Sequence, residues 1–298
     1  MFVVCFGDGL GNQMFQYAFY LEMKYRYPKN HIMADIGNWY GSDNNHNGFE
    51  LNKLFGIAIP QCNKKQALFL ADYHVSAKKN HPFIARYFAL RNAMFGPKGT
   101  LITVDDPTEF YKEVFELNPL NSYMLRGNWV NEKYFEHVDS QIRSAFVFPE
   151  IEDENNKKLM NDIQSCESVS VHIRGGDYLT MGITSLDGEY YSQAISIVKR
   201  KLSSYKLFVF SDDVEYARKM IGNEDAVFVT GNTGANSFRD MQLMSMCKHN
   251  IIANSTFSFW GAYLNNNPDK LVLAPSVSMR SYNKPFACSE WELVKVDR

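Results

Sequence analysis

The chain has 298 residues, of which 45% are hydrophobic and 21% are charged, the composition of a globular protein of two ordinary domains or one large one. Its 31 Lys and Arg residues nearly balance 33 Asp and Glu residues, for a net charge of −2. This balance excludes the clustered basic excess of a typical nucleic-acid-binding protein, but it permits a small positive site for a phosphate-bearing ligand.

Cysteine usage and hydropathy bear on the compartment. Residues 1–13 lack the basic start and long apolar stretch of a signal peptide, and no run of about 18 apolar residues predicts a membrane span. We therefore expect a cytoplasmic protein, and docking at the inner face of a membrane is compatible with this sequence. No C-x-x-C spacing indicates a zinc site or a disulfide framework among the five scattered cysteines, Cys5, Cys62, Cys166, Cys247 and Cys288.

The first half of the chain mixes predicted strands and helices. An apolar run at residues 2–6 reads as a buried strand, followed by a glycine loop and a helix at 12–27 that Pro28 stops. The region 64–95 predicts helix, broken near Pro82, with many Lys, Arg and aromatic residues. We interpret it as an amphipathic helix with a solvated basic side; the alternative is a surface for the acceptor or a membrane. Further strands are expected at 31–35, 101–104 and 123–126, a loop at 37–48, and a helix at 131–146.

The second half alternates more regularly. An acidic polar run after Pro149 marks a domain boundary, which we place so that the domains are residues 1–160 and 161–298. Alternating strands and helices predict a parallel sheet with helices on both faces, whose ligands bind beyond the carboxyl ends of the strands. The strands are expected at 168–173, 206–210, 226–229, 250–253 and 271–274, and the helices at 189–202, 214–221, 237–247 and 257–265.

One predicted strand ends in His172-Ile173-Arg174 and two glycines. Side chains alternate along a strand, so His172 and Arg174 share a face and the guanidinium stands at the carboxyl end. Arginine suits phosphate oxygens because its donors form a fixed fork, and Gly175 and Gly176 let a ligand approach the backbone. Asp177 is placed to orient Arg174 or to cap the next turn. A buried Arg–Asp pair without a ligand is the competing interpretation.

Two later strand ends add polar groups. Asp212 follows one strand, where its carboxylate suits a ribose hydroxyl or a guanine edge, or else the N-cap of a helix. Ser255 and Thr256 follow another and open a predicted helix, whose free N–H groups and dipole favour a diphosphate. The sequon Asn254-Ser255-Thr256 lies between a buried strand and an aromatic helix, which disfavours glycosylation.

The N-terminal loop has the sequence Gly7-Asp8-Gly9-Leu10-Gly11-Asn12-Gln13. A strand, a glycine loop and a helix in this order suit close approach to a sugar or a phosphate, although an ordinary tight turn has the same pattern. The dinucleotide pattern G-x-G-x-x-G is not met. Two glycine loops, one at the start of each half, predict two α/β domains facing a cleft.

Taken together, these motifs resemble glycosyltransferase family 11, the α-1,2-fucosyltransferases. The resemblance rests on the segment from Gly9 to Ala18, on His172-Ile173-Arg174 with Gly176-Asp177-Tyr178, and on the later motifs 211–213 and 254–258. It spans nearly the whole chain. One departure is Gly175, where the family usually has a second arginine.

The resemblance implies a GT-B architecture of two Rossmann-like domains and an inverting galactoside 2-α-L-fucosyltransferase. GDP-fucose would bind the C-terminal domain without a metal or another cofactor, and a galactoside glycan would be the acceptor. Arg174 would contact the β-phosphate, Ser255 and Thr256 the diphosphate, and Asp212 the nucleoside. His172 and Asp177 belong to the same donor motif.

By the same resemblance, Asn12 and the Gly9–Gly11 loop would face the fucose and the acceptor. Asp8 is a candidate base, or only a turn-former, and a base is dispensable if bond breaking runs well ahead of attack. The rival functions are transfer from another nucleotide sugar and non-catalytic binding of a nucleotide sugar or glycan.

Overall fold

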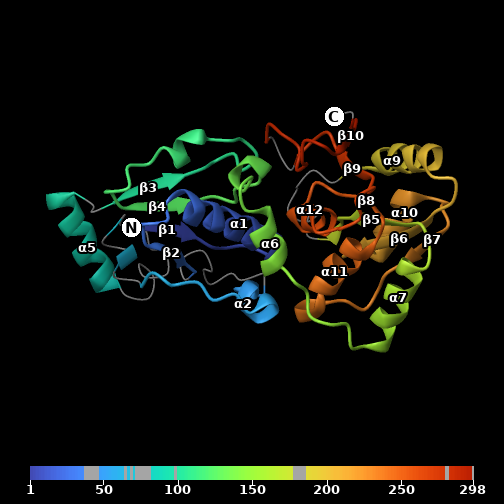
Figure 1. Ribbon diagram of the computed structural model, residues 1–298, viewed down its shortest axis with the longest axis horizontal. Helices are drawn as coiled ribbons and strands as arrows, with labels where there is room; N and C mark the ends of the chain where they lie inside the picture. The colour runs from blue at the N-terminus through green and yellow to red at the C-terminus, as the bar shows by residue number, and fades with distance from the viewer. Residues whose placement is uncertain are drawn as a thin grey trace. The chain divides into compact units, whose positions relative to one another are not determined.

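A computed structural model describes residues 1–36, 47–63, 66–67, 70, 82–96, 99–176, 186–278 and 282–296 (Figure 1). The chain divides into two compact units, Met1–Phe148 and Pro149–Arg298. The division falls after Phe148, whereas the expected domain ranges met at residues 160 and 161. Each unit contains its own parallel sheet.

The first unit is built on a four-stranded sheet in the order β2-β1-β4-β3. All its strand pairs are parallel, with Val3 of β1 opposite Met33 of β2 and Met124 of β4. The strand β1 is buried along its whole length, as expected of an apolar run in a parallel sheet covered on both faces. The strands are β1 (Phe2–Cys5), β2 (Ile32–Asp35), β3 (Thr100–Thr103) and β4 (Tyr123–Arg126).

An aromatic core lies between the first helix and the loop after β4. Phe19 of α1 stacks on Trp129 with ring centroids 3.8 Å apart, and Tyr134 meets both rings edge-on. All three side chains are fully buried. The helices of the described part of this unit include α1 (Leu10–Arg26), α2 (Glu50–Phe55), α5 (Pro82–Phe95) and α6 (Asp139–Ala145), and its 3₁₀ turns include η1 (Lys112–Phe115) and η2 (Glu132–Tyr134).

The second unit has a six-stranded parallel sheet in the order β10-β9-β8-β5-β6-β7. Its central strand β5 pairs with β8 on one side and β6 on the other. The strands are β5 (Ser168–Ile173), β6 (Lys206–Ser211), β7 (Ala226–Phe228), β8 (His249–Ile251), β9 (Val272–Pro275) and β10 (Glu292–Val294).

Helices cover both faces of this sheet. Val169, Val171 and Ile173 of β5 join a core with residues of α9 and α10. On the opposite face Asn250 of β8 donates to the Ser170 hydroxyl and to the Met244 carbonyl of α11. α11 packs against α7 and α12. The helices are α7 (Glu154–Gln164), α9 (Gly188–Lys201), α10 (Val214–Ile221), α11 (Phe238–Met246) and α12 (Thr256–Tyr263), with the 3₁₀ turn η3 (Gly234–Asn236).

The expected α/β fold with parallel sheets is confirmed, with differences in detail, among them the strand β10 and the helix α2, which were not predicted. The expected helix at 131–146 is two shorter elements, η2 and α6, because Asn131 caps η2 and the Tyr134 hydroxyl is tied to the backbone of Tyr111 and Glu109. The acidic run after Pro149 opens α7, with Asp153 as its N-cap. The helix α1 begins at Leu10, two residues before the expected start, so Gly11 lies inside it.

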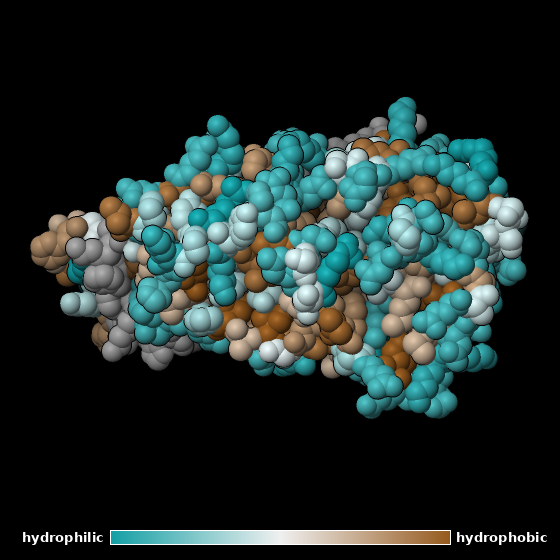
Figure 2. Space-filling model, viewed as in Figure 1, coloured by the Kyte–Doolittle hydropathy of each residue, from teal (hydrophilic) through white to brown (hydrophobic). Residues whose placement is uncertain are grey.

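Within the described part of the chain, no helix is both long enough and apolar enough to cross a bilayer. Hydrophobic residues do reach the surface, and Figure 2 shows them interspersed with hydrophilic residues over most of the visible face. The five cysteines are free thiols. Burial raises the pKa of the Cys5 and Cys247 thiols and raises that of Cys62 to about 12, so these thiols stay protonated at neutral pH.

Candidate active site

The carboxyl ends of three neighbouring strands gather most of the expected donor-binding residues in the second unit. Arg174 follows β5, Asp212 follows β6 and Ser255 stands between β8 and α12. Because β5 lies between β6 and β8 in the sheet, these three chain segments end side by side at one edge. Asp177, which was expected to support Arg174, lies outside the described residues.

Arg174 and Asp212 form an ion pair. Nη1 of Arg174 lies 3.1 Å from Oδ2 of Asp212, and both side chains are about three quarters buried. The other carboxylate oxygen, Oδ1, accepts a hydrogen bond from the Gly175 N–H at 2.9 Å. Asp212 was expected to contact the nucleoside; its contacts here are with the arginine and the glycine loop. It fixes the direction of the Arg174 guanidinium, and the arginine side chain as a whole is 27% exposed.

The neighbouring residues explain why Asp212 is available for this pairing. Asp213, not Asp212, caps α10, and its side chain accepts from the Tyr216 N–H at 2.9 Å. Ser211 accepts from the Asp213 N–H at 3.0 Å. The helix cap proposed for Asp212 therefore belongs to the next residue, which leaves the Asp212 carboxylate to face the β5 loop.

His172 is a buried neutral side chain. It is 4% exposed, and its ring lies 5.8 Å from that of Phe257. Burial, and then the positive charge of Arg174, lower the pKa of His172 to about 3, so the imidazole carries no charge above about pH 4. Its Nδ1 has no hydrogen-bond partner in the described part of the protein. An imidazole with this pKa is a weak base, which fits a role in shaping the strand end.

Ser255 and Thr256 open α12. Ser255 is the N-cap, and its hydroxyl oxygen accepts from the Phe257 N–H at 3.3 Å, so its own hydrogen remains to be donated. Thr256 is the first helical residue and is half-buried. Ser258 braces the turn, because its hydroxyl accepts from the Ala253 N–H at 3.2 Å. The helix begins at the same sheet edge as Arg174, with its positive end toward that edge.

The N-terminal loop of the first unit holds a carboxylate in a constrained position. Asp8 has a φ of 60°, in the left-handed region that few side chains adopt. Its Oδ2 accepts from Asn12 Nδ2 at 3.4 Å and from Asn128 Nδ2 at 3.3 Å. Gly9 is the N-cap of α1, and Gly11 is buried in its first turn. Asp8, Gly9 and Asn12 remain partly exposed.

Two buried glutamines on α1, which sequence reasoning did not single out, hold this loop. The Gln16 amide accepts from the Gly7 N–H and donates to Oδ1 of Asn128, both at 2.9 Å. Gln13 donates to the carbonyls of Asp8 and Gly48 and accepts from the Glu50 N–H. Both are fully buried. Two fully buried glutamines three residues apart on a helix indicate internal polar contacts. The sequence does not show which groups they bind, because those groups are distant along the chain.

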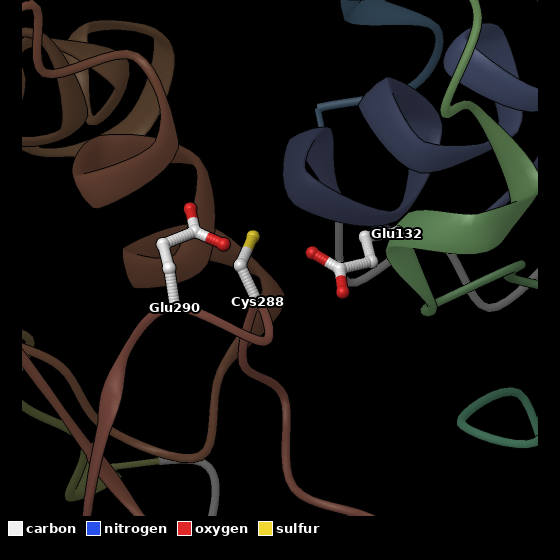
Figure 3. Close-up of side chains that lie close together, drawn as sticks. All are labelled: Glu132, Cys288 and Glu290. Atoms are coloured by element: carbon white, nitrogen blue, oxygen red, sulfur yellow. The ribbon is translucent and has the colours of Figure 1, made fainter.

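No three His, Cys, Asp or Glu side chains converge closely enough to hold a metal among the described residues of either unit taken alone. The side chains drawn in Figure 3 are Glu132, at the start of η2 in the first unit, and Cys288 and Glu290, on the segment leading into β10 in the second. Cys288 is buried and Glu290 is exposed. Measuring activity in the presence of EDTA tests whether the reaction needs a metal.

Comparisons with known proteins agree with this arrangement. The model of "Glycosyl transferase family 11" matches residues 109–292. An Escherichia coli alpha-1,2-colitosyltransferase is 33% identical, with 90% of this chain and 89% of that protein aligned. A Sus scrofa galactoside alpha-(1,2)-fucosyltransferase 1 is 29% identical over 55% of this chain and 50% of its own length.

Among solved structures, the fucosyltransferase NodZ from Bradyrhizobium aligns with a TM-score of 0.50 at 15% identity, over 87% of this chain and 91% of that one. The likeness extends to both units and identifies the fold as the GT-B type with Rossmann-like domains. The family model covers more than half of the chain, and the colitosyltransferase aligns over nearly its full length. This protein is therefore a glycosyltransferase related to fucosyl- and colitosyltransferases, and it belongs to glycosyltransferase family 11.

Proposed function

We propose that the protein is an inverting α-1,2-fucosyltransferase. It transfers L-fucose from GDP-β-L-fucose to a terminal β-galactoside of an oligosaccharide or polysaccharide precursor. The observation that carries the proposal is the Arg174–Asp212 pair, 3.1 Å apart at the sheet edge where α12 begins. A cation beside a helix N-terminus suits a nucleoside diphosphate, and the chain belongs to a family that has α-1,2-fucosyltransferases among its members.

The chemistry assigned to this edge is stabilisation of the departing GDP. As the glycosidic bond to the β-phosphate breaks, negative charge grows on the diphosphate and positive charge on the sugar ring. Arg174 would neutralise the phosphate oxygens, while the N–H groups and hydroxyls at the start of α12 would donate to them. Groups fixed in position before the reaction pay little reorganisation energy, so this electrostatic contribution is the main catalytic one.

The first unit would supply the acceptor side. Asp8 is the candidate base that takes the proton of the attacking galactose 2-hydroxyl. Its carboxylate is held by the amides of Asn12 and Asn128, and its left-handed backbone is fixed by the Gln13 bond to the Asp8 carbonyl. A loop that maintains an unfavourable backbone conformation is a common feature of functional sites.

A second donor has specific support. The colitosyltransferase relative aligns over nearly the whole chain, and colitose is L-fucose without its 3-hydroxyl group. A site that hydrogen-bonds the 3-hydroxyl discriminates strongly against a sugar that lacks it, whereas an apolar contact there does not. GDP-colitose is therefore the competing donor, ahead of UDP-sugars or binding without transfer.

The test is release of GDP from GDP-fucose, GDP-colitose and UDP-sugars, with and without lactose or N-acetyllactosamine, in EDTA. The proposal expects acceptor-stimulated release from GDP-fucose despite EDTA, with a product in α-1,2 linkage to galactose. A clear preference for GDP-colitose would replace the donor and keep the mechanism. Turnover that needs an added metal ion, or linkage to another hydroxyl, would contradict the proposal.

Variants at Arg174 link the activity to the geometry. Arg174→Ala is expected to lower kcat/KM by about 10²- to 10³-fold, and Arg174→Lys less, because lysine keeps the charge but loses the fork. Arg200→Ala, at an exposed arginine of α9 in the same unit, is the matched control and should change little. An Arg174→Ala protein with unchanged turnover would remove this residue from the mechanism.

A further inference from the structure

The helix α5 carries a stripe of large apolar side chains that face solvent. Phe83, Tyr87, Leu90 and Met94 are 88%, 65%, 61% and 62% exposed. Their spacing of four, three and four residues places them within an arc of about 60° on a helix. Asn92, near the opposite side of the helix, is only 9% exposed. Within the described part of the chain, the helix therefore has one buried face and a second, apolar face that is exposed.

Positive charge borders this stripe. Arg86 and Arg91 lie about 40° outside it on opposite sides of the helix, by the same helical geometry. Arg86 is exposed, and Arg91 reaches the Gly96 carbonyl at the end of the helix. From residue 73 to residue 104 the sequence contains five Lys or Arg residues and no Asp or Glu, in a chain whose net charge is −2. On α5 itself an apolar stripe is thus bordered by two arginines, and the sequence on either side of the helix adds further positive charge.

The apolar stripe and the arginines beside it discriminate between the partners that could cover α5. A second copy of this chain would bring arginines against arginines, so the charge argues against self-association through α5. The helix has 14 residues and two arginines, too short and too charged to span a bilayer. Aromatic and aliphatic side chains flanked by cations are typical of helices that lie in the interface of an anionic membrane. Figure 2 shows hydrophobic residues at the end of the face where Figure 1 places α5.

We propose that α5 docks the enzyme on an anionic lipid bilayer. Phe83, Tyr87, Leu90 and Met94 enter the boundary between headgroups and acyl chains. Arg86 extends along the same surface, so that its apolar stem covers hydrocarbon and its guanidinium group meets lipid phosphate. Arg91, whose Nη1 donates to Asn92 Oδ1 and to the Gly96 carbonyl, adds positive charge on the other side of the stripe. The contact uses residues outside the candidate active site, and it does not depend on which sugar is transferred.

The experiment is co-sedimentation with phosphatidylcholine vesicles, with and without about one third phosphatidylglycerol. Wild-type protein is expected to bind the anionic vesicles, to bind neutral vesicles at least about tenfold more weakly, and to lose binding at high salt. Phe83→Ser/Leu90→Ser and Arg86→Glu should each lower the bound fraction by at least about fivefold. A Tyr87→Trp variant should shift its added tryptophan emission to the blue on binding.

The control is Leu120→Ser, which removes a leucine that is more exposed (91%) than Leu90 from a loop of the same unit and should bind like wild type. Thermal unfolding and GDP release with a soluble acceptor confirm that the α5 variants are folded. Equal binding by wild type and Phe83→Ser/Leu90→Ser, or no binding to either vesicle, would overturn the proposal. So would a dimer in lipid-free solution that the same double substitution dissolves, because α5 would then contact another copy.

Discussion

Gly175 stands at the position where the resemblance to the family predicts a second arginine. A Cβ atom built there would lie 2.7 Å from Cδ1 of Tyr216 and 3.2 Å from its Cγ. Side-chain carbons do not approach each other that closely in folded proteins. The Tyr216 ring, in the first turn of α10, therefore occupies the space that the usual second arginine would need.

This contact predicts coupling between the two positions. Gly175→Ala should lower the free energy of unfolding by about 1–3 kcal/mol, the usual cost of an overpacked site. In a Tyr216→Ala background the same substitution should cost much less, and Gly175→Arg should be accommodated. Urea denaturation of the four proteins of the double-mutant cycle measures the coupling. Additive effects of the two substitutions would show that the Tyr216 ring moves aside without cost. Contact with this ring would then not explain why residue 175 is glycine.

At the scale of elements, α1 organises the candidate acceptor loop through its buried amides. Gln16 bridges the loop after β1 and the loop after β4, since it binds both the Gly7 N–H and the Asn128 side chain. Gln16→Leu is nearly isosteric and leaves both groups without this partner. Each buried polar group that loses its partner costs about 1–3 kcal/mol. We expect a loss of about 2–4 kcal/mol, together with faster hydrogen exchange at the Gly7 amide, measured by NMR.

Lys24→Gln, at an exposed position of the same helix, is the control and should leave stability within about 0.5 kcal/mol of wild type. Gln16→Glu separates the two bonds, because it keeps the acceptor for Gly7 and removes the donor to Asn128. If Gln16→Leu unfolded at the same denaturant concentration as wild type, the Gln16 bridge would contribute nothing to stability.

Much of this arrangement could be predicted from the sequence, because strands and strand ends are local signals. The β5 and β4 strands and the α10 helix have the expected bounds, and the bounds of β6, β7, β8 and β9 differ by one or two residues, whereas β10 was not predicted. Arg174 and Asp212 were expected at one edge, and they lie there. Their pairing was not foreseen, because nothing local distinguishes Asp212 from its neighbour Asp213 as the helix cap. Asn128 was not singled out either, because only the order of the strands in the sheet brings it beside Asp8.

At the scale of the second unit, α11 connects the entering chain to the edge of the sheet. Arg239 donates to the carbonyls of Pro149 and Glu150, the first residues of this unit. The next residue, Asp240, accepts from Asn232 Nδ2 at 2.8 Å, and Asn232 also exchanges amide hydrogen bonds with Asn156 of α7. The network joins α7, the loop after β7 and α11. Asp240 is the half-buried ionisable member of this network, so its charge affects the stability of the whole unit.

Burial raises the pKa of Asp240 to about 7, and the hydrogen bond from Asn232 offsets only part of this effect. In the unfolded chain the carboxyl titrates near its ordinary value of 3.8. Between these two values the folded state holds the proton and the unfolded state has lost it. The folded protein therefore binds more protons, and its stability falls as the pH rises from about 4 to about 7. Above about pH 7 this contribution no longer changes.

Asp240→Asn removes the titrating group while keeping an acceptor for Asn232. Its advantage over wild type in free energy of unfolding should grow from pH 4 to pH 7 and reach at least about 1 kcal/mol at pH 8, since one pKa unit corresponds to about 1.4 kcal/mol. Urea denaturation of the unliganded protein at several pH values measures this difference. Asp225→Asn, at an exposed aspartate between α10 and β7, is the matched control and should show no such growth. A constant difference between Asp240→Asn and wild type would show that Asp240 is ionised throughout this range, and that its charge is stabilised by the network around it.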